Sequence, residues 1–342
     1  MQYDNFDDED LNLPPSVRPS DGIVSKSSNY YSVSDGMDDK TKQRIRRPFL
    51  GLCLIAGACL LAGLLALIIV SIVMIKRAYS NLRFFPNPPY TSSTDYLHFV
   101  VVGDYGRGNQ AQMNVASGMA KYCANVKKCD FIISTGDNIY DNGVTSAQDE
   151  QFKTKFENIY TQESIKNLEW YKVHGNHDYR SNPDAQIEYA TTSYRWRMPN
   201  FYYNFTKWSS EKGFNVTFVM TDTNPFVTGY FSNSKMNQTA LNRQKAFNEA
   251  QLNMTETILR ESYYNQDNNS WVIVVGHHPV YSAGAHYNTP ELLQQYEPLF
   301  VKYKLPLYMC GHDHLINWLA NGAKGPTQYI VSGGGAGNTK MM

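Results

Sequence analysis

Residues 131–140 read FIISTGDNIY, an apolar run that ends in a threonine and a glycine and continues into aspartate, asparagine and tyrosine. The run is short and partly β-branched, which is typical of a strand covered on both faces. Glycine at its end permits a sharp turn, and the residues that follow include metal-binding types. The pattern recurs in LHFVVVGDYG (97–106), WYKVHGNHD (170–178), WVIVVGHHP (271–279) and PLYMCGHDH (306–314). The strands themselves are predicted at 97–102, 131–134, 170–173, 271–275 and 306–310.

Further apolar runs at 216–220 and 328–331 predict two more strands, and helices are predicted at 109–125, 241–262 and 290–303. This alternation predicts an α/β fold with helices packed on sheets. In such folds, sites form beyond the carboxyl ends of the strands. The five glycine turns are therefore expected to meet at one place.

Histidine placement supports a site at these turns. Seven of the eight histidines lie in or near the turns, and the full set is His98, His174, His177, His277, His278, His286, His312 and His314. His98 and His174 fall inside strand patterns and are interpreted as packing residues, whereas the role of His278 stays open. The collected donors are nitrogen and oxygen atoms without thiolate, which favours iron, zinc or manganese.

Composition excludes several classes of protein. The chain has 342 residues, with 31 basic and 31 acidic side chains, and this zero net charge argues against a nucleic-acid binder. Five cysteines are too few for a scaffold built on disulfides. A mean hydropathy of -0.46 excludes a polytopic membrane protein but leaves room for a single span.

One membrane-spanning helix is predicted at residues 49–75, which contain no charged residue and no proline. The stretch exceeds the roughly 20 residues that cross a bilayer as a helix. A buried soluble helix and a cleaved signal peptide are the alternatives. The first is rarely apolar on every side for this length, and the second is shorter and nearer the N-terminus.

Flanking charges predict the orientation of this span. Basic residues are more numerous before it (Lys40, Lys42, Arg44, Arg46 and Arg47) than after it (Lys76, Arg77 and Arg83). This asymmetry favours a cytoplasmic N-terminus and a type II topology, with the rest of the chain lumenal or extracellular. Glycosylation sequons agree, because all of them follow the span: Asn204, Asn215, Asn237, Asn253 and Asn268.

Four segments are therefore expected. Residues 1–48 are acidic and then rich in Ser, Asp and Pro, which indicates a disordered cytoplasmic tail. The span at 49–75 follows, then a proline-containing stalk at 76–95 and a folded domain at 96–342. Within that domain, Cys123 and Cys129 are close enough in sequence to form a disulfide, and residues 223–243 are expected to form a flap over the site.

Together the five motifs resemble those of the metallophosphoesterase superfamily, and more narrowly those of the small purple acid phosphatases, the tartrate-resistant type 5 group. That pattern is GDxG, GDxxY, GNH(D/E), VxxH and GHxH. It stands here as GDYG, GDNIY, GNHD, VVGH and GHDH, complete and in order, within a similarity that runs from about Leu97 to Asn338. Tyr140 distinguishes this group, because protein Ser/Thr phosphatases and nucleotidases of the superfamily lack an iron-binding tyrosine at that position.

The resemblance implies a fold and a metal centre. The implied fold is a four-layer α-β-β-α sandwich, in which two mixed sheets are flanked by helices. The implied centre is binuclear: Asp104, Tyr140 and His314 would bind Fe(III); Asn176, His277 and His312 would bind divalent iron, zinc or manganese; and Asp137 would bridge the two. His177 and His286 would bind phosphate and protonate the leaving group, and Asp178 would orient a histidine from behind the ligands.

The implied activity is that of a membrane-anchored acid phosphatase, in which metal-activated hydroxide attacks a phosphomonoester or a phosphoprotein. Two alternatives stay open: a phosphodiesterase or nucleotide pyrophosphatase of the same superfamily, and a phosphatase-like scaffold protein. An endomembrane, lysosomal or vacuolar, or cell-surface location follows from the predicted topology. The family pattern continues past Met342, so either a C-terminally truncated chain or a natural short form is expected.

Overall fold

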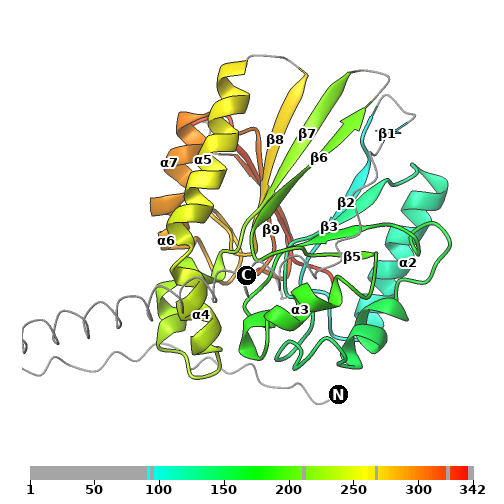
Figure 1. Ribbon diagram of the computed structural model, residues 1–342. Helices are drawn as coiled ribbons and strands as arrows, with labels where there is room; N and C mark the ends of the chain where they lie inside the picture. The colour runs from blue at the N-terminus through cyan, green and yellow to red at the C-terminus, as the bar shows by residue number, and fades with distance from the viewer. Residues whose placement is uncertain (1–90, 93–95, 210–212, 266–268, 321–323, 338–342) are drawn as a thin grey trace, which may run out of the picture. The chain divides into compact units, whose positions relative to one another are not determined.

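Two β-sheets form the centre of the computed structural model, which describes residues 91–92, 96–209, 213–265, 269–320 and 324–337 (Figure 1). The larger sheet has the strand order β1-β6-β7-β8-β9-β11-β10. Its strands are β1 (Thr91–Ser92), β6 (Tyr203–Ser209), β7 (Phe214–Met220), β8 (Ser270–Val275), β9 (Leu307–Cys310), β10 (Ile316–Ala320) and β11 (Gln328–Ser332). The smaller sheet has the order β2-β3-β4-β5, from β2 (Phe99–Val102), β3 (Phe131–Ser134), β4 (Trp170–Lys172) and β5 (Trp196–Arg197).

The expectation of two mixed sheets is correct for the larger sheet only. There, β6 pairs with β7 and β10 with β11 in antiparallel fashion, while the other pairings are parallel. All described pairings in the smaller sheet are parallel. Parallel strands bring their carboxyl ends to one edge, so the loops after β2, β3 and β4 emerge side by side.

Helices cover the outer faces of both sheets (Figure 1). Helix α2 (Gln110–Asn125) lies beside the smaller sheet, and α5 (Asn248–Asn265), α6 (Pro290–Gln295) and α7 (Glu297–Lys302) lie beside the larger one. Two short helices, α3 (Asp184–Tyr189) and α4 (Gln238–Lys245), precede these last three in the chain. The predicted helix at 241–262 is thus two helices, and the predicted helix at 290–303 is interrupted before Pro298, which cannot continue the backbone hydrogen bonding.

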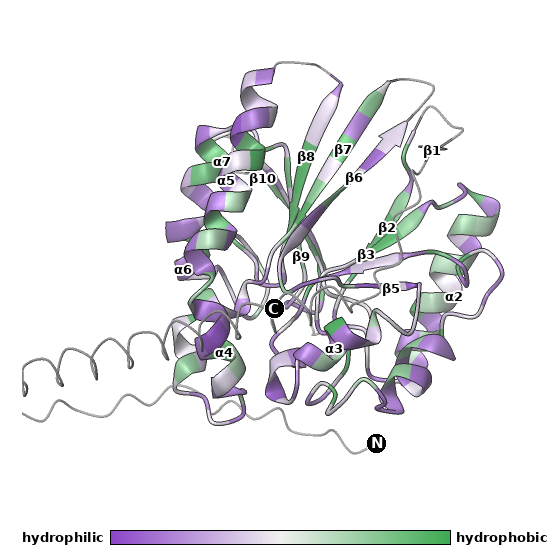
Figure 2. Ribbon diagram, viewed as in Figure 1, coloured by the Kyte–Doolittle hydropathy of each residue, from purple (hydrophilic) through white to green (hydrophobic). Residues whose placement is uncertain are grey.

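The two sheets pack against each other through an aromatic and aliphatic core. Phe131 lies on the smaller sheet, and Phe205 and Phe218 lie on the larger one. The Phe131 ring meets both of the others edge-on, at centroid distances of 6.2 and 5.5 Å, while Phe205 and Phe218 stack at 4.9 Å. Figure 2 shows apolar residues along β2 and along the part of β8 nearer β9, and the last four residues of β8 are buried, as in a strand covered on both faces.

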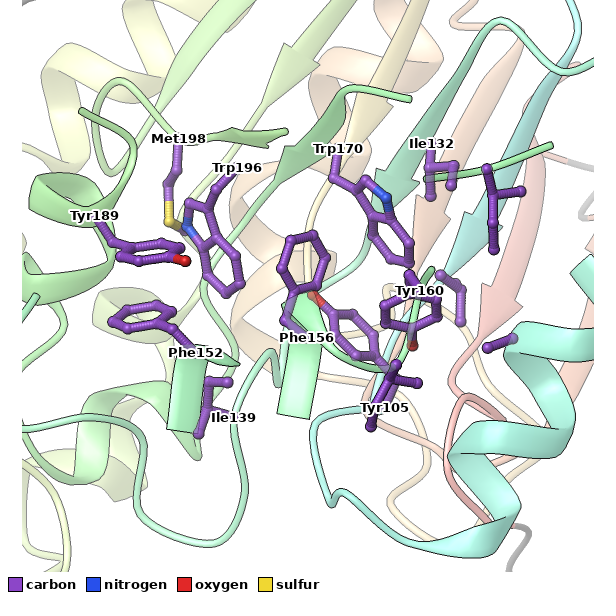
Figure 3. Close-up of a cluster of buried hydrophobic side chains, with 14 of the residues drawn as sticks. Tyr105, Ile132, Ile139, Phe152, Phe156, Tyr160, Trp170, Tyr189, Trp196 and Met198 are labelled. Carbon is purple, nitrogen blue, oxygen red and sulfur yellow. The ribbon is translucent and has the colours of Figure 1, made fainter. Parts of the chain in front are cut away.

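A second core lies on the outer face of the smaller sheet (Figure 3). It contains the fully buried rings of Tyr105, Phe156, Tyr160, Trp170 and Trp196. A third core joins α5, α6 and α7 to the outer face of the larger sheet. The chain therefore stacks as helix, sheet, sheet and helix, and this packing fixes the relative positions of the two sets of loops that follow the strands.

The structure shows the positions of the cysteines and of four of the predicted glycosylation sequons. Cys123 at the end of α2 and Cys129 just before β3 form a disulfide, and Cys310 is a buried free cysteine. Among the sequons, Asn204 and Asn253 are exposed and Asn215 is half-buried. Asn237 accepts a hydrogen bond from the Ala240 amide and donates one to the Ser181 carbonyl, so its side chain is engaged as a helix cap.

The remaining predictions concern residues that the structure does not describe. The tail at 1–48, the predicted span at 49–75, nearly all of the stalk at 76–95, and Asn268 lie outside the described residues. Within the described parts of the chain, no helix combines the length and the apolar character needed to cross a bilayer.

Candidate metal centre

The five glycine turns meet where the two sheets adjoin. Asp104 follows β2, Asp137 follows β3, and Asn176 lies in the loop after β4. His277 follows β8 and His312 follows β9, so the larger sheet supplies the other side. The predicted convergence of these turns is therefore correct.

Three of the turn residues have an unusual backbone conformation. Asp104, Asp137 and His312 have φ angles of 58°, 49° and 70°, in the left-handed region that residues with a Cβ seldom adopt. Such residues cluster at functional sites, where the surrounding structure holds them in place. Each turn here directs its side chain into the shared space beyond the strand.

Crowding at the turns explains two of the glycines. A Cβ on Gly175 would lie 2.1 Å from Asp137 Oδ1, and one on Gly311 would lie 2.4 Å from Asp104 Oδ2. Both distances are far below van der Waals contact with a carboxylate that has little room to move. Only glycine lets these loops approach the two aspartates so closely.

One set of donors consists of Asp104, Tyr140 and His314. Tyr140 Oη lies 3.1 Å from Asp104 Oδ1 and 3.0 Å from His314 Nε2. Asp104 Oδ1 and His314 Nε2 are 3.5 Å apart. The carboxylate and the phenol are almost fully buried, so these three donors share a space largely closed to bulk water.

A second set consists of Asn176, His277 and His312. Asn176 Oδ1 lies 3.0 Å from His277 Nε2 and 3.1 Å from His312 Nδ1. The other nitrogen of His277, Nδ1, is 2.8 Å from the Thr135 carbonyl oxygen. It donates to that carbonyl and leaves the Nε2 lone pair directed at the shared space.

Asp137 lies between the two sets. Its Oδ1 atom is 3.6 Å from His277 Nε2 and accepts a hydrogen bond from the His177 amide at 2.9 Å. On its other side it interacts with the Tyr140 hydroxyl. Donor atoms of Asp104, Asp137 and His277 all lie within 4.8 Å of one another.

These donor distances fit bound metal ions. Protein ligands lie about 2.0–2.2 Å from a transition-metal ion, so neighbouring ligands on one ion are about 3–3.5 Å apart. The separations within each set, 3.0–3.5 Å in the first and 3.0–3.1 Å in the second, match this spacing. No Lys or Arg in the described part of the chain forms an ion pair with Asp104 or Asp137.

The pKa values of the buried acidic groups also indicate that this site binds cations. Burial and the neighbouring charge of Asp137 raise the pKa of Asp104 well above its usual range. Burial and the Asp104 carboxylate likewise raise the pKa of Tyr140. Burial opposes ionisation of Asp137 too, but His277 and His177 outweigh it and lower its pKa to about 2. A cation among these groups would favour the ionised carboxylate and phenolate together.

The two predicted catalytic histidines lie at the rim of the donor sets. The His177 ring packs against Tyr140 at 4.3 Å, and its Nδ1 donates to the Asp141 carbonyl at 2.5 Å. His286 is exposed, and its ring packs against His312 at 4.3 Å. Both rings therefore border the space that the donors enclose.

Asp178 differs from its prediction. It lies behind the donors, but it contacts no histidine by hydrogen bond. It accepts hydrogen bonds from the Gly175, Asn138 and Ile139 amides and from the Asn138 and Gln186 side chains. A buried carboxylate satisfies several N–H groups at once, and here it fixes the turn from Asp137 to Tyr140.

The other histidines separate clearly. His174 is fully buried and stacks on Phe201 at 4.9 Å, as expected of a packing residue, and His98 is half-buried outside the donor sets. His278 lies close to the centre, since one of its ring nitrogens is within 4.8 Å of donor nitrogens of His277 and His312.

Two residues near the centre were not predicted from the sequence. Thr223 and Tyr230 each hydrogen-bond one nitrogen of His278, both at 2.7 Å. Both come from the 223–243 segment, whose polar and aromatic composition had suggested only a flap. That segment is built from two 3₁₀ turns, Asn224–Phe226 and Thr228–Phe231, followed by α4.

Comparisons with known proteins agree with this geometry. The family described as Calcineurin-like phosphoesterase matches residues 97–315. Purple acid phosphatase 7 of Arabidopsis thaliana is 34% identical over 275 residues, which are 79% of each chain. Tartrate-resistant acid phosphatase type 5 of Oryctolagus cuniculus is 33% identical over 248 residues, 71% of this chain and 74% of the relative.

Among solved structures, the chain is similar in fold to the one titled "GAP50 the anchor in the inner membrane complex of Plasmodium". The TM-score is 0.57 with 23% sequence identity, over 71% of this chain and 75% of that one. At this identity the likeness concerns the fold alone.

Proposed function

Since this chain belongs to the calcineurin-like phosphoesterase family, with purple acid phosphatases among its relatives, we propose that it is an acid phosphatase that hydrolyses phosphomonoesters. The observation that carries the proposal is the meeting of two three-donor sets on either side of Asp137. A single ion would not use all seven donors, whereas a pair of ions would. Paired ions are a common solution for phosphoryl transfer.

In this proposal, Asp104, Tyr140 and His314 bind Fe(III), and Asn176, His277 and His312 bind a divalent iron, zinc or manganese ion. Asp137 contacts both. The phenolate and carboxylate suit the harder ion, and the neutral imidazoles and amide suit the divalent one. When bound, such a pair polarises a phosphate ester and makes water a nucleophile in mild acid.

The protein's own groups would then orient the ester and protonate its leaving group. The His177 ring is fixed by its hydrogen bond to the Asp141 carbonyl, so its Nε2 stays directed at the enclosed space. Exposed and next to His312, His286 is reachable by the departing alkoxide and can act as its acid. No side-chain nucleophile is required.

The activity is tested on the full-length chain with p-nitrophenyl phosphate in mild acid, together with metal analysis and added tartrate. We expect two metal ions per chain, one of them iron, and turnover that tartrate leaves unchanged. Bis(p-nitrophenyl) phosphate, assayed in parallel, should react more slowly. Preferential cleavage of this diester would identify a phosphodiesterase instead, and a chain with neither metal nor turnover would contradict the proposal.

Ligation by Tyr140 has a spectroscopic test. The Tyr140→Phe variant should lose the visible charge-transfer band of a phenolate bound to Fe(III). Tyr160→Phe is the matched control, because this tyrosine is equally buried but belongs to the outer aromatic core. An unchanged band in Tyr140→Phe would remove Tyr140 from the ligand set.

We further propose that residues 49–75 anchor the domain at 96–342 to a membrane in a type II orientation, with residues 1–48 in the cytoplasm and 76–95 as a stalk. The support is the uncharged span, the basic residues before it, and the exposure of Asn204 and Asn253. Protease protection and glycosidase treatment of the chain in intact membranes test this topology. The proposed topology would be contradicted if protease added on the cytosolic side cleaved the catalytic domain, or if that domain carried no glycans.

A further inference from the structure

The hydrogen bonds around Thr223 determine which way its hydroxyl points. Thr223 Oγ1 accepts from the His277 amide at 3.3 Å and from the His278 amide at 3.1 Å. A hydroxyl oxygen has two acceptor sites, and both are then occupied. Its own proton is left to donate to His278 Nδ1, which lies 2.7 Å away.

This assignment fixes the tautomer of His278. Because Nδ1 accepts from Thr223, the ring proton is on Nε2. His278 Nε2 lies 2.7 Å from Tyr230 Oη, so the imidazole is the donor and the phenol oxygen is the acceptor. The Tyr230 hydroxyl keeps its own proton for another partner, and none of the described residues accepts it.

Hydrogen bonds tie the turn that carries Tyr230 to two helices, which limits where its hydroxyl can lie. Thr228, two residues earlier, donates from its amide and its hydroxyl to Glu291 Oε1 at 2.8 and 2.5 Å. Gln238 Nε2 donates to the Tyr230 carbonyl at 2.9 Å. These bonds tie the turn Thr228–Phe231 to α6 on one side and to α4 on the other.

The donor also lies beside the enclosed space. The Tyr230 ring is 5.4 Å from the His278 ring, which in turn is 4.6 Å from the ring of His312. Among the charges that act on Tyr230, that of Asp137 has the largest effect. An anion held by the donor sets would therefore lie on the side of Tyr230 where its hydroxyl has no acceptor among the described residues.

We propose that Tyr230 is a substrate-binding residue, whose hydroxyl donates a hydrogen bond to a phosphate oxygen of the ester bound at the candidate metal centre. The inference rests on the proposed function and extends it to a residue outside the five motifs. Thr223 and His278 act as positioning residues, since they turn the phenol into a free donor. The segment 223–243 thereby supplies a contact to the phosphoryl group, a more specific role than the flap expected from its sequence.

The first test compares wild type, Tyr230→Phe and the control Tyr264→Phe, all as full-length, metal-loaded chains. Tyr264 is exposed at the end of α5, and the strand β8 separates it from His277, which follows the other end of that strand. Loss of a hydrogen bond to a charged oxygen should weaken binding of inorganic phosphate, measured by calorimetry, and lower kcat/KM for p-nitrophenyl phosphate by about 10- to 100-fold. Metal content and the visible band should stay as in wild type.

A second pair of variants tests the direction of the hydrogen bonds. Thr223→Ser keeps the hydroxyl and should behave as wild type. Thr223→Val removes the donor to His278 Nδ1, so the ring can move its proton to Nδ1 and accept the Tyr230 proton at Nε2. Its loss of phosphate affinity should therefore approach that of Tyr230→Phe, and the double variant should lose little more than either single one.

The outcomes distinguish this inference from the proposed function. An active wild type with Tyr230→Phe equal to Tyr264→Phe in phosphate affinity and kcat/KM would overturn the role of Tyr230 alone. Equal behaviour of Thr223→Val and Thr223→Ser would overturn the assigned direction of the hydrogen bonds. A wild type that binds metal but hydrolyses no phosphoester would refute the proposed function, and this inference with it.

Discussion

Replacing Lys172 by methionine should make the folded chain more stable at neutral pH. Lys172 is fully buried on β4, and its Nζ atom has one hydrogen bond, to Tyr105 Oη at 2.5 Å. Its other neighbours are aromatic: Nζ lies 3.9 Å from the centre of the Trp196 ring, 4.1 Å from that of Phe156 and 4.7 Å from that of Trp170. Figure 3 shows these three rings and that of Tyr105, the fourth ring near the amine. Methionine has a similar length and makes favourable contacts with such rings.

The magnitude follows from the protonation of the amine. Burial lowers the pKa of Lys172 well below its usual range, against the smaller opposing effect of Glu157. In the unfolded chain the pKa is about 10.4. Between these two values the unfolded chain binds the additional proton, so the free energy of unfolding rises with pH, by about 1.4 kcal/mol for each unit. Deprotonating this amine at pH 7 costs up to about 5 kcal/mol relative to the unfolded chain. The methionine variant lacks this cost and this slope, and should be about 1–4 kcal/mol more stable near pH 7.

Urea unfolding of the full-length chain in detergent, at about pH 7, 8 and 9, measures both quantities in the range below the usual pKa of the amine. Lys121→Met is the control, because Lys121 is exposed on α2 and should change neither the stability nor the slope. If the wild-type slope is no steeper than that of Lys172→Met, or if the variant is destabilised, the amine is charged in the folded chain. The aromatic rings would then hold an ammonium ion, and the reasoning would be wrong.

Three further predictions concern other buried groups. Burial raises the pKa of Asp222 to about 6, so the folded chain keeps a proton that the unfolded chain releases near pH 4; the free energy of unfolding should fall by about 3 kcal/mol between these values. Asp222→Asn should remove this pH dependence. If calorimetry across the same pH range gave wild type and variant the same dependence of unfolding free energy on pH, the prediction would be wrong. Asp178→Asn puts N–H donors against the N–H groups of Asn138 and Gly175. The metal affinity, measured by competition with increasing concentrations of a chelator, should therefore fall about 10- to 100-fold. An affinity equal to that of wild type would show that the turn does not depend on the carboxylate. Cys123→Ser should lower the free energy of unfolding in urea by about 2 kcal/mol under oxidising conditions, and a reductant should bring wild type to the same value.

Most of the strands could be predicted because their apolar runs are continuous. The prediction for β3 is correct to the residue, and those for β4, β8, β9 and β11 differ by one residue at an end. Strand β6 was missed because Lys207 occupies one of its buried positions and hides the alternation of buried and exposed residues. Its charge is balanced by Glu169 across the sheets, at 3.3 Å, a contact that the local pattern cannot reveal.

The metal donors could be predicted as residue types, but not every contact around them could be. Asp178 was expected to contact a histidine, yet the close fold of the Asp137–Tyr140 turn presents several N–H groups to it first. Tyr230 could not be found from spacing, since it precedes His278 by 48 positions. The two residues meet in the folded chain, where α6 and α4 hold the turn that carries Tyr230. Contacts of this kind depend on tertiary packing, which sequence periodicity does not encode.

The division of the donors between the two sheets has a consequence for biosynthesis. The loops of the smaller sheet contribute the four donors that lie between Asp104 and Asn176. Those of the larger sheet contribute His277, His312 and His314, which the ribosome adds more than a hundred positions later. A nascent polypeptide thus exposes a carboxylate-rich half-centre long before its imidazole partners exist. On the proposed function, ion capture is one of the last events of maturation. A shortage of metal would leave newly made molecules joined through the core between their sheets, but without the cations that balance Asp104 and Asp137.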